Sequence, residues 1–200
     1  MNKLEANVSL VIITFFAAIQ YVFLSGVPDT VSHFSFLCIT NLIGFVITLA
    51  LFFSELFRVD KKQLLQSLVM SLLLFGFNIF LLLGSSGVGA TVSACVLSAY
   101  FVFIPLLAFV LYRQKPSINS LIGILIVLFG LFFMLGADVS GLFNLNILYL
   151  VIADVFFALY ILMADKYTQG SNPALLAMGQ MFFNFIFALL FWSGESLILK

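Results

Sequence analysis

Long apolar runs constrain the fold of this 200-residue chain more than any other feature. Only 8% of the residues are charged, against about a quarter in an ordinary soluble domain, so polar groups could not cover a water-exposed surface. A helix needs about 20 apolar residues to cross the hydrocarbon core of a bilayer. Backbone groups in lipid must be satisfied within their own segment, and the runs lack the two-residue period of barrel strands. Helices are therefore predicted over seven runs: Val8–Leu24, Phe34–Ser54, Leu64–Gly84, Ala90–Tyr112, Ser117–Gly136, Asn144–Ala164 and Pro173–Ser193.

The predicted fold class is an all-α, polytopic membrane helical bundle with about seven transmembrane helices. Val8–Leu24 is longer than the apolar core of a signal peptide, which has about 7–15 residues, and no clear cleavage site follows it. We therefore interpret this run as a retained first helix. Cys38 and Cys95 both fall inside predicted spans, so we interpret them as small apolar fillers rather than as disulfide partners or metal ligands.

The basic residues predict the orientation of the chain, because Lys and Arg prefer cytoplasmic loops. Of the eight basic residues, only Lys200 falls on the opposite side from the others. We expect a cytoplasmic N-terminus and a multi-pass protein of the plasma membrane, that is, the cell inner membrane. The formal net charge of zero argues against a nucleic-acid partner. The seven basic residues on the predicted inner side are Lys3, Arg58, Lys61, Lys62, Arg113, Lys115 and Lys166.

Asp154 is the sharpest functional signal in the sequence. By helical rise it lies close to the membrane midplane, where an ionised carboxylate costs roughly 2.5–3.5 kcal/mol. No Lys or Arg lies at a comparable depth. Three interpretations stay open: a neutral side chain bonded to a neighbouring helix, a group that contacts substrate or a proton, or a misplaced span.

Uncharged polar side chains occur in the other predicted spans. Any single Asn or Gln is more often a tie between helices than a ligand group. Their convergence in depth nevertheless predicts a polar cavity open toward the outside. With Asp154, the predicted substrate-binding residues are Gln20, Asn41, Asn78, Ser98, Tyr100 and Asn184, while Gln180 lies deeper toward the inside.

Small residues and a proline mark two further predicted helices. A small-residue stripe at Gly87, Ala90, Ala94 and Ser98 favours close packing of the helix over 90–112, and Pro105 is expected to kink that helix. Small residues spaced by seven, Gly123, Gly130 and Ala137, predict a smooth scaffold seam on the next helix.

Enzyme and metal motifs are absent, so the chain is predicted not to be an enzyme and to need no cofactor. The one histidine, His33, lies in a predicted loop, which excludes di-histidine metal motifs and a membrane-embedded Ser-His-Asp set. There is no phosphate-binding loop with a Gly-Lys signature. Paired intramembrane carboxylates are missing, because Asp154 stands alone.

An internal repeat is suggested by an offset of 140 residues. This offset brings Leu10-Val11-Ile12 onto Leu150-Val151-Ile152, and Phe45 and Glu55 onto Phe185 and Glu195. The implied unit has five helices, and an odd-numbered unit must be inverted in the membrane. The predicted domains are therefore a first repeat over residues 1–140 and the start of a second over 141–200.

The segment Leu72–Gly136 resembles helices three to five of EamA-type transporters in the drug/metabolite transporter superfamily. The likeness rests on Gly76 and Asn78, a small-residue start to the next helix, Pro105-Leu106, a basic turn and a Gly-x6-Gly helix. Asn146–Tyr167 is similar to the start of the family's second repeat, with an Ala-x-Tyr motif and a trailing Lys. The chain departs from the family at Tyr112–Lys115, where a Gly-Glu-Arg-like turn is common.

The resemblance implies a transporter of small metabolites or drugs that works by alternating access and is coupled to an ion or a proton, or exchanges substrates. The implied partners are the lipid bilayer and a small-molecule substrate. The family has ten helices and the chain about seven, so it is interpreted as truncated, with a homo-oligomer or a second chain completing the bundle. The alternatives are a non-transporting membrane partner or structural remnant and, against the predicted orientation, a seven-helix receptor.

Overall fold

The computed structural model describes residues 32–85, 88, 90–113, 116–134 and 144–198, together with Val8, Val11 and Phe15. The chain divides into two compact units, Met1–Ser32 and His33–Lys200, and the second unit is described below. The first predicted span, Val8–Leu24, lies outside the described residues except at the three named positions, and so does Gln20.

The second unit is helical over its described residues and follows the predicted runs closely. Each long helix starts within three residues of its predicted start, because each run of apolar side chains can satisfy its backbone only as a helix. Asn144 and Asn172 cap two of the helices by accepting a bond from a backbone N–H of the first turn. The elements are α2 (His33–Leu51), η1 (Phe53–Arg58), α3 (Lys61–Ser85), α4 (Ala90–Leu97), α5 (Tyr100–Tyr112), α6 (Ile118–Met134), α7 (Leu145–Thr168) and α8 (Pro173–Ile198).

Five segments of the described chain are long and apolar enough to cross a membrane. They are α2, α3, the combined segment Val92–Tyr112 across α4 and α5, α7 and the Pro173–Gly194 part of α8. The apolar stretch of α6, Ile118–Gly130, is shorter. The chain is therefore a polytopic membrane protein.

The predicted single helix over 90–112 is broken, but not at the proline. Turns at Ser98 and Ala99 separate α4 from α5, whereas Pro105 lies within the continuous α5. At the break the backbone N–H groups of Ser98 and Ala99 donate to carbonyls three residues back, and the Ser98 hydroxyl donates to the Cys95 carbonyl at 2.6 Å. A serine that bonds its own helix in this way competes with the regular i→i−4 pattern, which explains a break at this position.

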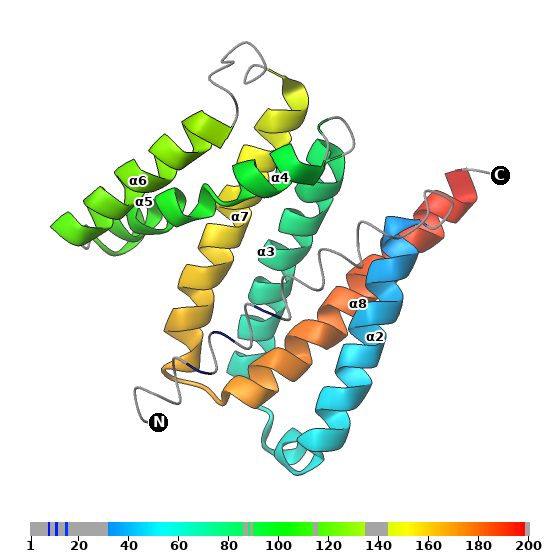
Figure 1. Ribbon diagram of the computed structural model, residues 1–200. Coiled ribbons are helices and arrows are strands. Elements are labelled where there is room, and N and C mark those ends of the chain that lie inside the picture. Colours follow the sequence, from blue (N-terminus) through cyan, green and yellow to red (C-terminus); the bar gives the residue numbers. More distant parts are fainter. Residues whose placement is uncertain are drawn as a thin grey trace. The chain divides into compact units, whose positions relative to one another are not determined.

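Helix α3 lies between α7 and α8 (Figure 1). It runs antiparallel to α7, since Phe80 stacks on Phe156 while Gly84, further along α3, meets the earlier residue Leu150. It runs parallel to α8, because Ser67 and Ser71 donate hydrogen bonds to the carbonyls of Leu176 and Gln180. The packing of α3 therefore joins segments more than 100 residues apart in the sequence.

Helix α2 packs on the outer side of α8 and runs antiparallel to it (Figure 1). Phe34 near the start of α2 contacts Phe191 near the end of α8, with ring centroids 5.4 Å apart. Phe45 further along α2 contacts Phe182 earlier in α8, at 5.3 Å. Aromatic pairs at this spacing contribute about 0.5–1.5 kcal/mol beyond the area that they bury.

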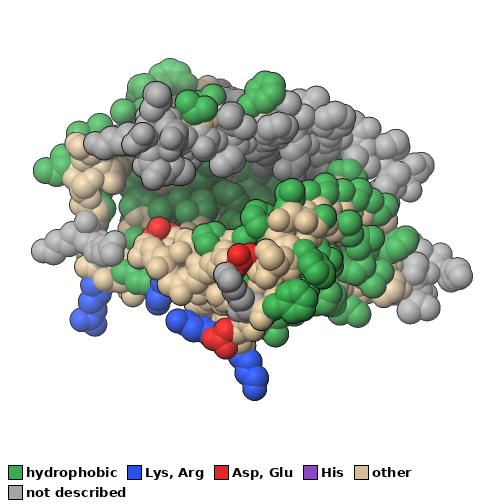
Figure 2. Space-filling model, turned by 90° about the horizontal axis from the view of Figure 1, so that it is seen from below, with side chains coloured by type: hydrophobic (Ala, Val, Ile, Leu, Met, Phe, Trp, Pro, Cys, Tyr) green, Lys and Arg blue, Asp and Glu red, His purple; other side chains and the backbone are tan. Residues whose placement is uncertain are grey.

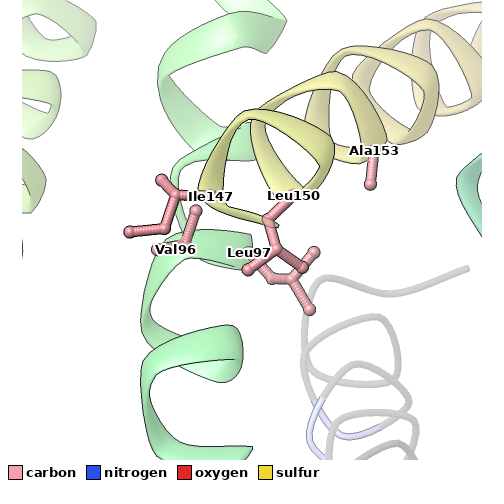
Figure 3. Packing of buried hydrophobic residues seen from close by; sticks show 5 residues of the cluster. All are labelled: Val96, Leu97, Ile147, Leu150 and Ala153. Atoms are coloured by element: carbon pink, nitrogen blue, oxygen red, sulfur yellow. The ribbon is translucent and has the colours of Figure 1, made fainter. Parts of the chain in front are cut away.

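Two clusters of buried side chains hold these helices together. The first joins α4 to α7 through Val96, Leu97, Ile147, Leu150 and Ala153 (Figure 3). The second joins α2, α3 and α8 through Cys38, Phe75 and Ala188. Cys38 and Cys95 are free and buried, as predicted for apolar fillers.

Close approach through small residues is seen on α3 and α8, whereas the two predicted small-residue faces are described only in part. Gly87, Ala137 and the side chain of Ala90 lie outside the described residues. Ala94 on the expected stripe is exposed, and a Cβ added at Gly123 or Gly130 would meet nothing within 4 Å. The tight contacts lie instead on α3 and α8, where an added Cβ at Gly84 or Gly179 would stand 2.6 Å from a neighbouring side chain. Small residues permit close packing, but close contact forms only where another helix packs against them.

Charged side chains gather at the end of the unit that carries the α2–α3 and α7–α8 connections (Figure 2, seen from this end). Lys61, Lys62 and Lys166 are exposed there, beside the acidic residues Asp60 and Asp165. Away from this charged end, the exposed surface of the helices is apolar, as a lipid-facing surface requires.

Candidate functional site

Asp154 is completely buried on the face of α7 that packs against α3. It belongs to a stripe of buried residues at helical spacing: Ile147, Leu150, Ala153, Asp154 and Ala158. Neither of its carboxyl oxygens has a hydrogen-bond partner among the described residues. The interpretation of Asp154 as a tie to a neighbouring helix therefore has no contact to support it, and a buried polar group left in this state costs about 1–3 kcal/mol.

Asn184 on α8 is also a buried polar side chain without a hydrogen-bond partner among the described residues. The residue is 2% exposed, and neither the oxygen nor the nitrogen of its amide has a partner in the described part of the chain. It follows Leu176 and Gln180 at four-residue spacing, so the three side chains share one face of α8. The carbonyls of Leu176 and Gln180 accept hydrogen bonds from α3, so this is the face directed toward α3.

Gln180 lies one turn from Asn184 and connects α7 to α8. The Tyr160 hydroxyl donates to the Gln180 side-chain oxygen at 3.3 Å. Tyr160 is a site residue that sequence reasoning did not select, although the Ala-x-Tyr motif contains it. Its signal was weak because a tyrosine in a membrane helix is ordinarily interpreted as an interface anchor.

Tyr100 on α5 lies against the same part of α7. Its ring meets Phe157 edge to face at 5.0 Å, and Phe157 contacts Tyr160 at 5.9 Å. Phe157 follows Asp154 by three residues on α7, within one helical turn. A continuous series of contacts therefore runs from Tyr100 through Phe157 and Tyr160 to Gln180.

Apart from Gln20, which lies outside the described residues, the remaining predicted site residues bond to their own helices. Asn41 and Asn78 each donate to a carbonyl four residues back, at 2.7 and 3.0 Å, and Ser98 donates three residues back. These bonds use part of each side chain's hydrogen-bonding capacity locally, without reaching another helix. The structure thus separates the predicted set into residues bonded locally, Asp154 and Asn184 with unused polar atoms, and Tyr100 packed on α7.

A groove of about 340 Å³ lies between α5 and α6. None of the predicted site residues lines it, and Ser120 is the one polar side chain among its described lining residues. Its lining residues are Phe101, Ile104, Pro105, Ser120, Gly123, Ile124 and Val127. Such an apolar groove facing lipid offers few groups that could orient a polar ligand.

The described residues contain no group of three His, Cys, Asp or Glu side chains placed to hold a metal ion. The side chains brought together at the candidate site offer hydrogen bonding and, at Asp154, a change of charge state.

Comparison with known proteins places the chain in a sequence context. Residues 5–136 match the EamA-like transporter family. An uncharacterized transporter of Archaeoglobus fulgidus is 26% identical over 186 residues, which make up 93% of this chain and 57% of that protein. The chain thus spans a little over half the length of this relative. No solved structure matches it.

Proposed function

The chain belongs to the EamA-like transporter family, and on this premise we propose that it moves a small metabolite or drug across the cell inner membrane by alternating access. In this proposal the N-terminus and the charged end of the helical unit face the cytoplasm. Transport is secondary, and Asp154 couples it to a proton or binds a cationic group of the substrate.

The polar atoms of Asp154 and Asn184, which have no partner among the described residues, carry the proposal. A binding site in a membrane needs polar groups whose hydrogen-bonding capacity is free until the ligand arrives, and ionisable groups within spans mark such pathways. Asp154 and Asn184 meet this condition on two helices that pack on α3. Tyr100 contributes an aromatic wall, and the other predicted residues, Gln20, Asn41, Asn78 and Ser98, complete the polar lining.

The antiparallel contact of α2 with α8 supports the proposed domains, residues 1–140 and 141–200. Under the 140-residue offset, α2 corresponds to α8. Helices that are related by a two-fold axis in the membrane plane and meet at that axis must run antiparallel. The contacts of Phe45 with Phe182 and of Gly44 with Met181 lie close to the point where the offset makes the two helices equivalent.

Uptake by proteoliposomes that hold the chain tests the role of Asp154. A trapped pH dye reports proton movement while amino acids, other metabolites and cationic drugs are offered in turn. We expect Asp154→Asn to abolish the pH dependence of uptake, because the amide cannot exchange a proton.

The matched control is Asp165→Asn, an exposed position at the cytoplasmic end of the same helix, which should leave uptake unchanged. Uptake by Asp154→Asn with the pH dependence of the original chain would rule out the coupling role.

A further inference from the structure

Two side-chain hydrogen bonds join the α7–α8 connection to the α2–α3 region. Asn172 donates to the Glu55 carboxylate at 3.1 Å, and Ser171 donates to the Gln66 side-chain oxygen at 2.7 Å. Glu55 lies in η1 and Gln66 in the second turn of α3. Both bonds therefore cross from the first proposed repeat to the second.

The Asn172 amide is oriented by its second role as the cap of α8. Its side-chain oxygen accepts a bond from the Ala174 backbone N–H at 3.0 Å. The other end of the amide, its NH₂ group, is thereby directed to Glu55, and its bond to the carboxylate is of the stronger, charge-assisted kind. The residue thus fixes both the start of α8 and its attachment to η1.

Directly beyond these bonds, α8 is in tight contact with α3. Leu176 is 1% exposed, and its carbonyl accepts the Ser67 hydroxyl. Gly179 lies close enough to Ser67 that an added Cβ would stand 2.6 Å from the Ser67 oxygen. The pairs Asn172–Glu55 and Ser171–Gln66 thus lie at the charged end of the contact between α3 and α8.

We propose that these two hydrogen bonds form a latch that closes the cytoplasmic end of the transporter and breaks when the site opens to the cytoplasm. The inference rests on the proposed transport function, since only alternating access requires this end to open. Substrate release then involves separation of the first turns of α8 from α3, with Leu176 becoming accessible to water.

Labelling of a cysteine at position 176 by a water-soluble maleimide tests the latch in membrane vesicles that carry the chain. The variant Leu176→Cys is made together with Cys38→Ala and Cys95→Ala, so that only one thiol reacts. Labelling is run at a low maleimide concentration, where the reaction is slower than opening and closing, so that its rate follows the population of the open state. Breaking a charge-assisted hydrogen bond should raise that population by about tenfold or more.

Asn172→Asp keeps the cap of α8 but sets a carboxylate against Glu55, so we expect labelling to rise about tenfold or more. Adding Glu55→Gln restores a hydrogen bond in the opposite direction, because the new amide at position 55 can donate to the new carboxylate at position 172. The labelling rate should then return to that of the parent. Asn172→Ser keeps the cap and removes the amide NH₂ that reaches Glu55, because the serine side chain is shorter. It provides a second route if Asn172→Asp does not fold.

Unchanged labelling in Asn172→Asp and Ser171→Ala, or faster labelling that Glu55→Gln does not reverse, would overturn the latch. Labelling needs no substrate, so the two proposals fail separately. Uptake by Asp154→Asn with an unchanged pH dependence counts against the transport mechanism. Labelling that does not respond to the loss of the two hydrogen bonds, in a chain with pH-dependent uptake, counts against the latch.

Discussion

Replacing Gly179 with alanine should destabilise the protein at the crossing of α3 and α8. The added Cβ would stand 2.6 Å from the Ser67 oxygen and 2.7 Å from the Ser67 Cβ, which is closer than atoms in ordinary contact. Overpacking of this kind costs about 1–3 kcal/mol. Displacing Ser67 also endangers its 3.3 Å bond to the Leu176 carbonyl, which is worth about 0.5–1.5 kcal/mol.

Alanine is the better helix former by roughly 0.5–1 kcal/mol, which offsets part of this loss. The net effect should be a fall of about 1–3 kcal/mol in the free energy of unfolding. Reversible unfolding in mixed detergent micelles, followed by the loss of helical circular dichroism, measures this quantity.

Gly123→Ala is the matched control, because its new Cβ meets nothing within 4 Å. It should leave stability unchanged or raise it slightly through helix propensity. Combining Gly179→Ala with Ser67→Gly removes the clashing side chain and should restore much of the lost stability. If Gly179→Ala proved as stable as Gly123→Ala, the close crossing of α3 and α8 would be refuted.

Two further substitutions test the polar atoms in the helical unit by the same unfolding measurement. Asp154→Leu removes a buried carboxyl that has no partner among the described residues. The free energy of unfolding should therefore rise by about 1–3 kcal/mol, while uptake is lost. A destabilised variant would mean that Asp154 is bonded in the protein. Tyr160→Phe deletes the hydroxyl that bonds Gln180 and should cost about 0.5–1.5 kcal/mol, whereas no change would show that this bond contributes nothing to holding α7 against α8.

The long helices that the structure describes could be predicted from the sequence to within a few residues. The predicted helix Asn144–Ala164 corresponds to α7, which spans Leu145–Thr168. The predicted helix Leu64–Gly84 corresponds to α3, which spans Lys61–Ser85. This success has a local cause, because apolar length and the need to satisfy the backbone in lipid are properties of each segment alone. The interruption at Ser98 was missed, since Pro105 was the stronger local signal for a break.

Which polar and small residues matter was decided by the tertiary structure. Asn78 and Asn184 look alike as amides within apolar runs, yet Asn78 bonds the carbonyl of Leu74, while Asn184 has no partner among the described residues. Gly123 and Gly179 are both glycines within helices, but only Gly179 has a helix against it. Sequence pattern determined where helices form and which residues are costly in lipid. The partner of each side chain depends on which helix faces it, and that is set by contacts between segments more than 100 residues apart.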